Sequence, residues 1–511
     1  MAYPVETEIK LAATPAMLRK LRSHPMLAGA EQTDILVTTY YDTTDARLKR
    51  GGAALRIRES GKAREQTLKL TLPGGTSVQR GEWNAVTASD LPELSAFAVK
   101  PRTAIVRLLD GAALEPIAIN RIKRTKRRLQ FGGSAIEIAF DLGTIEAGGR
   151  KKAVCELEIE LVEGHLSDVI ALALHLPLGP GLRWSVSSKA ERCYLLAYED
   201  LQPTAIRAGP VKLSTNMDAA SGFQAIAWNC LGQLLANYPL VIASGDAEAV
   251  HQSRVAIRRL RAACSLFKDV ADDDNAPVLR AELKAVAMAL GPPRDLHVLI
   301  GRVSSAAGAS DQDAGELLAH LSARLDTATQ SAQMFLAGGS FQRLLFQFAG
   351  WIEGGKWLKR KEETGGDQPL VPFATRALSR RRRKMRRLTD PLSDMSDAAR
   401  HQLRIDAKKL RYAAEFFASI YRGRKPTKQR RAFMTGLGRL QDSLGELNDM
   451  IVATMARKTL FEGLEPIVAA RLAAQLDELL ADHEKSRGKL LKAACRSLAR
   501  VAGATAWWKA G

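Results

Sequence analysis

Apolar and polar residues alternate along the first 200 residues, as is typical of strands with one buried face. The alternation recurs in ETEIKL, ALRIRES, QTLKLTL, QRGEWNAV, AIEIAFD and CELEIEL. From about residue 217 onward, apolar residues instead recur at helical spacing, in long segments rich in Ala, Leu, Arg and Glu. We therefore predict an α+β protein, with an antiparallel β domain over 1–202, a linker over 203–216 and an all-α domain over 217–505.

The helical half repeats itself. The segments HQSRVAIRRLRAACSLF (251–267) and HQLRIDAKKLRYAAEFF (401–417) match at the His, Gln, Arg, Leu-Arg, Ala-Ala and terminal Phe positions, with a shift of 150. Each is followed by a second partial match, LGPPRDLHV (290–298) and LGELNDMIV (444–452). Such internal similarity predicts a duplicated helical unit, with copies over about 217–350 and 370–505.

Composition and charge narrow the class of protein. The 511 residues are 46% hydrophobic and 25% charged, which is ordinary for a globular chain of more than one domain. The net charge is +20, and residues from 211 onward hold 46 Lys/Arg against 31 Asp/Glu, so the helical half favours polyanionic partners. Five scattered cysteines without metal-ligand spacing, and no recognisable signal peptide or membrane-spanning stretch, predict a cytoplasmic protein.

Several predicted strands carry charge on one face and apolar residues on the other, because positions i and i+2 of a strand share a face. Acids dominate some of these faces and bases dominate others. The charged positions are Glu6, Glu8 and Lys10; Arg56 and Arg58; Lys69; Arg80 and Glu82; Arg124, Lys126 and Arg128; and Glu156, Glu158 and Glu160.

Two interpretations of these charged faces remain open. A half-exposed antiparallel sheet would present them to solvent. A sheet closed on itself with charge inward would enclose both a cationic lining and a carboxylate cluster. The lining would suit phosphoryl oxygens, and the carboxylates would suit Mg²⁺ or Mn²⁺, which prefer oxygen ligands.

The charged strands resemble the motifs of the triphosphate tunnel metalloenzymes, also called CYTH proteins. ETEIK resembles the ExExK signature of this family, and the further matches are TTYYDT, LRIR, TLKL, RGEW, RTKRR, IEIAFDLG, CELEIEL and SSKAERCYL. The resemblance covers residues 1–200 and implies an eight-stranded antiparallel β tunnel. It implies a divalent metal, Mg²⁺ or Mn²⁺, and a triphosphate substrate.

The resemblance also implies roles for individual residues. Substrate binding falls to Lys10, Arg56, Arg58, Lys69, Arg80, Arg124, Lys126 and Lys189. Metal binding falls to Glu6, Glu8, Asp141, Glu158 and Glu160, with the alignment of Glu156 against its two neighbours left open. Catalysis falls to Lys10, Arg56, Arg58, Glu82 and Lys189.

The family includes inorganic triphosphatases, thiamine triphosphatases and adenylate cyclases. No Walker A sequence occurs in the chain, so the P-loop route to a triphosphate is absent. We expect hydrolysis of inorganic triphosphate, with a thiamine or nucleoside triphosphatase, or a class IV-like adenylate cyclase, as alternatives.

The repeated helices carry a basic stripe. On a helical wheel, Arg254, Arg258 and Arg261 fall within an arc of ~80° beside His251. The second copy repeats the stripe with His401, Arg404, Lys408 and Arg411. A solvated basic face is the alternative, but like charges at this spacing repel one another, so their repetition favours a bridging anion. The run RALSRRRRKMRRL (376–388) adds to the basic character, without the aromatic residues or groove-reading motif of a specific nucleic-acid binder.

This half resembles the CHAD domain, the conserved-histidine α-helical domain, over about 215–500. The resemblance implies a helical bundle that binds inorganic polyphosphate through His251, Arg254, Arg258, Arg261, Arg294, His401, Arg404, Lys408 and Arg411. Arg294 and Asp295 match the family's Arg-Asp pair, whereas Asn448 stands at the equivalent basic position of the second copy. A polyphosphate-binding or granule-associated scaffold with little catalysis remains the alternative to an enzyme.

Overall fold

The computed structural model describes residues 5–71, 76, 78–307, 314–358, 368–387 and 392–509. The chain divides into two compact units. The first consists of residues 1–206, 231–243 and 335–355, and the second consists of residues 207–230, 244–334 and 356–511. The segment between the two predicted helical copies, from about residue 350 to about 370, includes 359–367, which lie outside the described residues.

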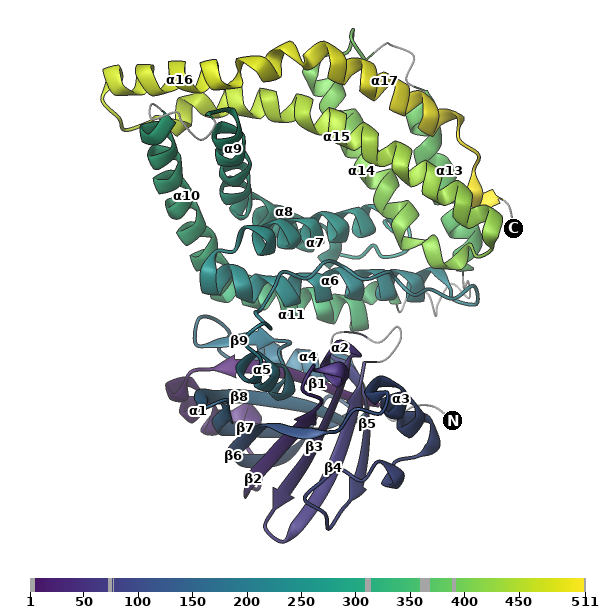
Figure 1. Ribbon diagram of the computed structural model, residues 1–511. Coiled ribbons are helices and arrows are strands. Elements are labelled where there is room, and N and C mark those ends of the chain that lie inside the picture. Colours follow the sequence, from purple (N-terminus) through teal and green to yellow (C-terminus); the bar gives the residue numbers. More distant parts are fainter. Residues whose placement is uncertain are drawn as a thin grey trace. The chain divides into compact units, whose positions relative to one another are not determined.

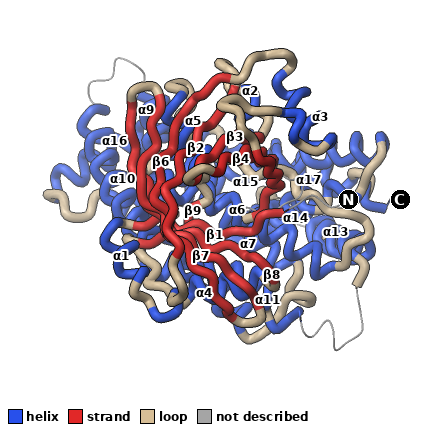
Figure 2. The backbone as a smooth tube through the Cα atoms, turned by 90° about the horizontal axis from the view of Figure 1, so that it is seen from below, coloured by secondary structure: helices blue, strands red, loops and turns tan. Residues whose placement is uncertain are grey.

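The first unit is built on a closed antiparallel sheet (Figures 1 and 2). The strands follow the order β5-β4-β3-β2-β6-β7-β8-β1, and β1 pairs again with β5, so eight strands close a barrel. A short strand, β9, extends the free edge of β1 beyond its pairing with β5. The bounds are β1 Val5–Ala13, β2 Gln32–Asp42, β3 Ala53–Ser60, β4 Ala63–Leu70, β5 Gln79–Val86, β6 Glu115–Phe131, β7 Ser134–Ala147, β8 Arg150–Glu163 and β9 Leu182–Ser185.

The apolar faces of the strands lie on the outside of the barrel, beneath helices. Leu55, Ile57 and Leu68 are buried in a cluster that includes Ile105 of α3. On another wall, Ile159 of β8 is fully buried, and α1 and α4 pack against this strand. The charged faces therefore turn inward, and the interpretation of a closed sheet with charge inside is confirmed. The helices are α1 Pro15–Arg22, α2 Arg47–Arg50, α3 Val99–Leu109, α4 Leu166–Leu174 and α5 Lys189–Ala197.

Helical segments from later in the chain complete the first unit. These are the second half of α6 (Ala219–Ser244) and α11 (Gly339–Gly354). Trp184 of β9 stacks on Phe346 of α11 with ring centroids 4.2 Å apart, and its backbone N–H donates to Gln342 Oε1 at 3.1 Å. Asn237 of α6 exchanges two hydrogen bonds with the backbone of Ile206. The barrel domain and these helices thus share one hydrophobic core.

The second unit is helical and shows the repeat directly. Helices α7 (Ala247–Leu266) and α14 (Asp397–Phe416) both have 20 residues, with bounds that differ by 150. Asp246 and Ser396 cap their N-termini in the same way, each accepting from the backbone N–H three residues on. The two helices pack against each other. The described helices of this unit also include α8 Asn275–Ala289, α9 Gly291–Ala307, α10 Ala314–Ala337, α13 Leu370–Arg386, α15 Arg424–Leu460, α16 Pro466–Lys485 and α17 Arg487–Gly503.

The two copies differ where prolines interrupt the first. In that copy, α8 ends at Ala289 and α9 starts at Gly291, just before Pro292 and Pro293. Proline lacks an N–H and is tolerated only in the first turn of a helix, so a new helix must begin there. The second copy has LGEL at this point, and α15 runs uninterrupted for 37 residues.

One described helix, α6, is long and apolar enough to cross a membrane by length and composition. This finding corrects the expectation that the chain holds no such stretch. Within the structure, 61% of its apolar window is buried, as in the core helix of a soluble protein, so it is weak evidence for a membrane span.

Candidate active site

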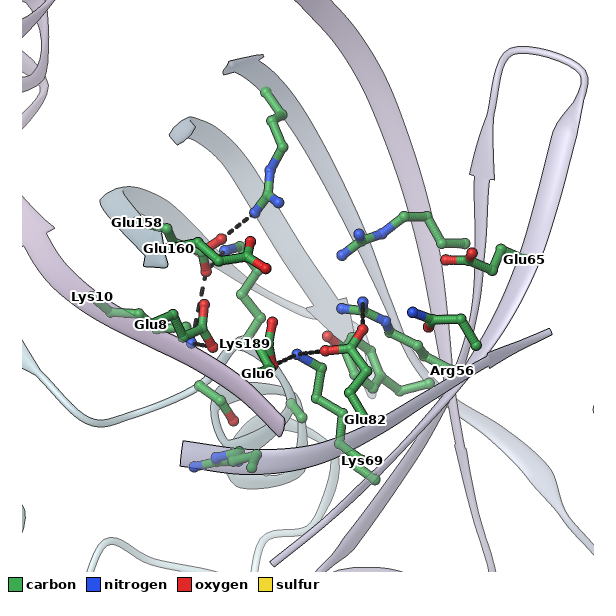
Figure 3. Close-up of a pocket in the computed structure, with 18 of the residues that line it drawn as sticks. Glu6, Glu8, Lys10, Arg56, Glu65, Lys69, Glu82, Glu158, Glu160 and Lys189 are labelled. Carbon is green, nitrogen blue, oxygen red and sulfur yellow. Dashed lines mark hydrogen bonds and ion pairs between the residues drawn. The ribbon is translucent and has the colours of Figure 1, made fainter. Parts of the chain in front are cut away.

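The barrel encloses a cavity of ≈390 Å³ whose lining is mostly charged (Figure 3). All eight predicted substrate-binding bases line it, together with six carboxylates. The carboxylates are Glu6, Glu8, Glu65, Glu82, Glu158 and Glu160. Asp141 is fully buried and does not line this cavity, so the structure brings together all the predicted tunnel residues except this one.

Strand register explains why acids and bases meet. Glu8 on β1 lies directly across from Glu160 on β8, and Lys10 lies across from Glu158. On the other side of β1, which also pairs with β5, Lys69 of β4 lies across from Glu82 of β5. Directly opposite residues of an antiparallel pair have side chains on the same face. Alternate positions of these strands therefore project together into the cavity.

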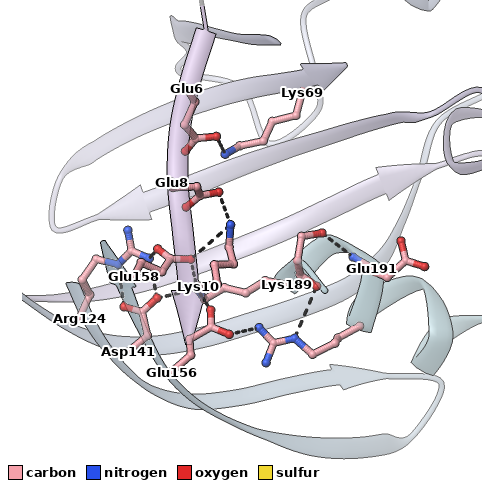
Figure 4. A network of polar contacts seen from close by, with 12 residues as sticks. Glu6, Glu8, Lys10, Lys69, Arg124, Asp141, Glu156, Glu158, Lys189 and Glu191 are labelled. Atoms are coloured by element: carbon pink, nitrogen blue, oxygen red, sulfur yellow. Dashed lines mark hydrogen bonds and ion pairs between the residues drawn. The ribbon is translucent and has the colours of Figure 1, made fainter. Parts of the chain in front are cut away.

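A buried ion network forms one wall of the site (Figure 4). Lys189, at the start of α5, lies among three carboxylates: its Nζ is 2.6 Å from Asp141 and 2.9 Å from Glu158, and it also pairs with Glu156. Burial opposes ionisation of Glu158, but the surrounding cations, Lys189 first, hold its pKa well below the ordinary value. The three carboxylates in turn raise the pKa of Lys189 despite its burial, so Lys189 stays protonated.

Arg124 closes the network from β6. Its Nε donates to Asp141 at 2.7 Å, and its Nη2 donates to both Asp141 and Glu158. Arg192 of α5 pairs with Glu156 from the other side. Oxygens of Asp141, Glu156 and Glu158 lie within 4.8 Å of one another, a spacing that could hold a metal ion. Lys189, Arg124 and Arg192 supply three positive charges to these three carboxylates, so the trio is engaged as an ion network.

The carboxylates that face the cavity are less fully compensated. Burial and the neighbouring Glu8 raise the pKa of Glu6 to about 7, although Lys69 pairs with it. Burial, Glu8 and other acids also raise the pKa of Glu160, which has no cationic partner within the described chain. Glu82 differs, because burial is outweighed there by the combined effect of Lys69 at 2.8 Å, a hydrogen bond with Glu6 and the charge of Arg56, which together lower its pKa to about 2. Crowded carboxylates with too few cations favour binding of a positive ion.

Oxygen donors of this kind fit a hard divalent cation. Glu6, Glu8 and Glu160 project into one cavity, and two of them face each other across neighbouring strands. Mg²⁺ and Mn²⁺ take carboxylate oxygens and water as ligands, and they need no nitrogen or sulfur donor. The chemistry of the donor set therefore fits such an ion.

Two of the cations in the cavity have no carboxylate partner among the residues described. Arg58 makes one hydrogen bond, from Nε to Thr38 at 3.4 Å, and Arg80 makes no polar side-chain contact within this part of the chain. Burial and the nearby Arg56 and Arg124 lower the pKa of Arg58 to about 10. These guanidinium groups are available to an anion without breaking an existing ion pair.

Some residues of the site escape the sequence analysis. Glu137 lies across from Glu160 and pairs with Lys126 at 2.6 Å, which leaves this predicted phosphate contact already neutralised. The alternation in AIEIAFD could have found it, because Glu137 and Asp141 share a face. Glu65 and Tyr40 also line the cavity, and neither stands out within its strand pattern.

The second candidate site lies on α7, α9 and α14. The basic stripe consists of His251, Arg254, Arg258 and Arg261 on α7 and of His401, Arg404, Lys408 and Arg411 on α14. Burial and the neighbouring Arg294 lower the pKa of His251 to about 4. Arg254 is anchored by Leu290 O at 2.9 Å and by Asp295 at 3.5 Å, and its pKa is lowered by burial and by Arg258, Arg294 and Arg404. The two copies of the stripe thus contribute to one electropositive surface.

The copies differ in detail. His401 is exposed, and its Nδ1 lies 2.5 Å from Asn448 Oδ1, so the residue that replaces the base of the first copy contacts the histidine. Arg411 is engaged by Glu415 at 2.9 Å and by Gln441 at 3.2 Å. Each copy therefore has at least one arginine of the stripe paired with an acid, Arg254 with Asp295 and Arg411 with Glu415.

Comparisons with known proteins agree with both resemblances. A family model for the CYTH domain matches residues 5–194, and one for the CHAD domain matches residues 225–458. An inorganic triphosphatase of Haemophilus influenzae is 31% identical over 202 residues, which is 37% of this chain and 54% of the relative. The chain thus spans about half the length of that relative.

A solved structure supports the fold of the helical domain. The crystal structure of the CHAD domain from the plant Ricinus communis is 27% identical, covers 58% of this chain and 96% of its own, and aligns with a TM-score of 0.51. A putative adenylyl cyclase from Hippeastrum, described as having a dominant triphosphatase activity, is 19% identical over 31% of this chain and 80% of its own, with a TM-score of 0.21. The second likeness is too weak to carry an argument. The chain is a CYTH–CHAD protein, with a CYTH domain over residues 5–194 followed by a CHAD domain over residues 225–458.

Proposed function

We propose that the barrel hydrolyses inorganic triphosphate to pyrophosphate and phosphate with the help of a divalent metal. The observation that carries this proposal is the cavity itself, where eight bases and six carboxylates meet inside a closed sheet. In the reaction, the oxygen of a water molecule bonds to a terminal phosphorus. The bridging P–O bond breaks, pyrophosphate leaves, and the proton of the water passes to solvent or phosphate.

The cationic side of the cavity binds and orients the substrate. Arg58 and Arg80, which lack carboxylate partners in the described chain, make the first contacts with phosphoryl oxygens. Arg56 lies 3.7 Å from Glu82 and can bind both the acid and a phosphate. Fixed cations aimed at oxygens that gain charge in the transition state are the largest catalytic contribution expected of such a site.

The carboxylate side holds the metal. Glu6, Glu8 and Glu160 would be its first ligands, whereas Glu158 and Asp141 would become available only if both Lys189 and Arg124 released them. When bound, Mg²⁺ or Mn²⁺ supplies charge neutralisation and orients the attacking water. Lys189 contributes a permanent positive charge, since its carboxylate neighbours keep it protonated.

The lining supports inorganic triphosphate over an organic triphosphate. Tyr40 is the one aromatic residue among the lining residues described, and it is only 2% exposed. An adenine or thiamine group would find no exposed ring to stack on there. The similarity to an inorganic triphosphatase supports the same choice. A thiamine or nucleoside triphosphatase and an adenylate cyclase remain the alternatives.

We further propose that the helical domain binds inorganic polyphosphate through the basic stripe and Arg294. The electropositive group around Arg254 supports this, because its members repel one another unless an anion lies between them. Polyphosphate binding would keep a cytoplasmic enzyme near a source of phosphate chains, such as a polyphosphate granule. A scaffold with little catalysis is the alternative.

One assay separates these possibilities. Purified protein with Mg²⁺ or Mn²⁺ is given inorganic triphosphate, ATP and thiamine triphosphate in parallel, and phosphate release is measured. The proposal predicts a kcat/KM for inorganic triphosphate at least ~100-fold above the others. Equal turnover of ATP contradicts the substrate assignment. If none of the three substrates is hydrolysed while polyphosphate binds tightly, the protein is a polyphosphate-binding scaffold and not a triphosphatase.

A further inference from the structure

A hollow of ≈360 Å³ lies between α13 and the C-terminal segment, and neither the tunnel nor the basic stripe includes it. Five of its lining residues are cationic and none is a carboxylate. The lining residues are Ser379, Arg382, Arg383, Arg386, Arg387, Ala506, Trp508 and Lys509. Such a concentration of like charge in one concave surface needs an explanation.

Aromatic packing fixes one wall of the hollow. Trp508 is 2% exposed, with its ring centroid 5.5 Å from that of Phe433, and its Nε1 donates to Ser379 Oγ at 3.0 Å. Arg382 donates to the backbone oxygens of Ala502, at 2.8 Å, and Ala504, and its guanidinium lies 5.8 Å from the Trp508 ring. The wall is therefore a built surface and not a chance gap between side chains.

Basic residues of α13 and its C-terminal end differ in whether they pair with an acid. Arg380 and Lys384 pair with acids of other segments, Asp269 at 3.8 Å and Asp406 at 2.8 Å. Arg383, Arg386 and Arg387 are exposed, and no carboxylate of the described chain pairs with them. Arg386 and Arg387 follow Arg383 by three and four positions at the C-terminal end of α13, a spacing at which like charges repel. A bound anion would relieve this repulsion.

We propose that this hollow binds a short condensed phosphate, namely pyrophosphate or triphosphate, at a site separate from the tunnel and the basic stripe. Guanidinium groups bind phosphoryl oxygens through paired, charge-assisted hydrogen bonds. Several guanidiniums at one concave site match the high charge density of a short phosphate chain. Single-stranded nucleic acid fits less well, because its bases need exposed aromatic rings and Trp508 is buried.

The site can be tested on the full chain by ¹⁹F NMR after labelling with 5-fluorotryptophan. Trp508→Phe assigns the Trp508 resonance, and pyrophosphate is then added without metal. The proposal predicts a saturable shift of this resonance at submillimolar pyrophosphate. In Arg383→Gln/Arg386→Gln, the same shift should require at least ~10-fold more pyrophosphate.

A matched control removes two exposed charges from α17 with Lys492→Gln/Arg496→Gln, and it should leave the titration unchanged. A shift that is absent up to millimolar pyrophosphate, or that persists unchanged in the α13 variant, overturns the proposal. If a single-stranded oligonucleotide at the same phosphate concentration shifts the Trp508 resonance equally, the hollow binds polyanions in general, and its assignment to a short condensed phosphate is wrong. None of these results depends on hydrolysis in the tunnel.

Discussion

The ion network around Lys189 gives a quantitative prediction. Lys189→Met removes a 7% exposed ammonium from among Asp141, Glu156 and Glu158, whose side chains are 0%, 3% and 11% exposed. Loss of one partner from a buried ion pair costs about 3–5 kcal/mol, because the remaining charge is left uncompensated. Arg124 and other cations remain, so we expect the lower end, about 3 kcal/mol. At ~2–4 °C per kcal/mol, the Tm of the barrel unit should fall by roughly 6–12 °C.

The loss should depend on pH. Burial opposes the charges of Asp141 and Glu158, yet the cations hold both pKa values below their ordinary values. A carboxylate with a depressed folded pKa stabilises the protein above its unfolded pKa of ~4, and this stabilisation is lost as pH falls. Without Lys189 these carboxylates protonate more readily, so the difference from the unmodified protein should be larger near neutral pH than at about pH 5.

Differential scanning calorimetry at both pH values measures this difference. The control is Lys151→Met, which removes a 61% exposed lysine that pairs with Glu146 at 2.7 Å. An exposed pair contributes ~0–1 kcal/mol, so the control should hardly shift the Tm. If Lys189→Met lowers the Tm no more than the control, or by the same amount at both pH values, the reasoning about the network is refuted.

Three further predictions follow from other contacts. Gln342→Ala should destabilise the first unit by ~1–3 kcal/mol, because the buried backbone N–H of Trp184 loses its acceptor. The control Gln347→Ala, at an exposed position of the same helix, should change the free energy of unfolding by no more than ~0.5 kcal/mol. Denaturant unfolding followed by tryptophan fluorescence measures both changes, and equal losses of stability would contradict this role of Gln342. Because the pKa of Glu6 is raised to about 7, this carboxyl loses its proton across neutrality, and Mg²⁺ binding measured by calorimetry should strengthen as the pH rises. Glu6→Gln should flatten this pH dependence, and an equal dependence in the two proteins would contradict the assignment of Glu6 as a metal ligand. NMR titration should find His251 with a pKa of about 4, rising when polyphosphate neutralises the arginines around it; an unchanged pKa at saturating polyphosphate contradicts the role of the stripe.

Strand periodicity predicts some features of the barrel and not others. The alternation in ETEIKL and CELEIEL predicts that Glu6, Glu8, Glu158 and Glu160 share charged faces, and the structure brings all four to one cavity. Periodicity could not show that β1 pairs with β5, which closes the sheet, because pairing partners are set by long-range packing. The family resemblance supplied that closure.

The metal assignment marks the limit of sequence reasoning at the site. Asp141 lies on the same face as Glu137, yet it does not line the cavity and instead contacts Arg124 and Lys189, which do. Which acid meets a cation depends on the position of α5, which carries Lys189 and is not set by strand alternation. For the same reason, a sequence pattern cannot separate Arg58, which has no carboxylate partner in the described chain, from Arg56, which lies near Glu82. The assigned roles of these residues stay predictions.

The central claim is that the carboxylates of β1 bind the metal for hydrolysis in the tunnel, while the helical domain binds polyphosphate independently. The double variant Glu6→Gln/Glu8→Gln tests it most directly, because glutamine keeps the side-chain volume and removes the charge. Phosphate release from inorganic triphosphate and the Kd for long-chain polyphosphate are measured on the same preparation. The account predicts that kcat/KM falls by at least ~100-fold with the Kd unchanged. Hydrolysis at the unmodified rate would contradict it.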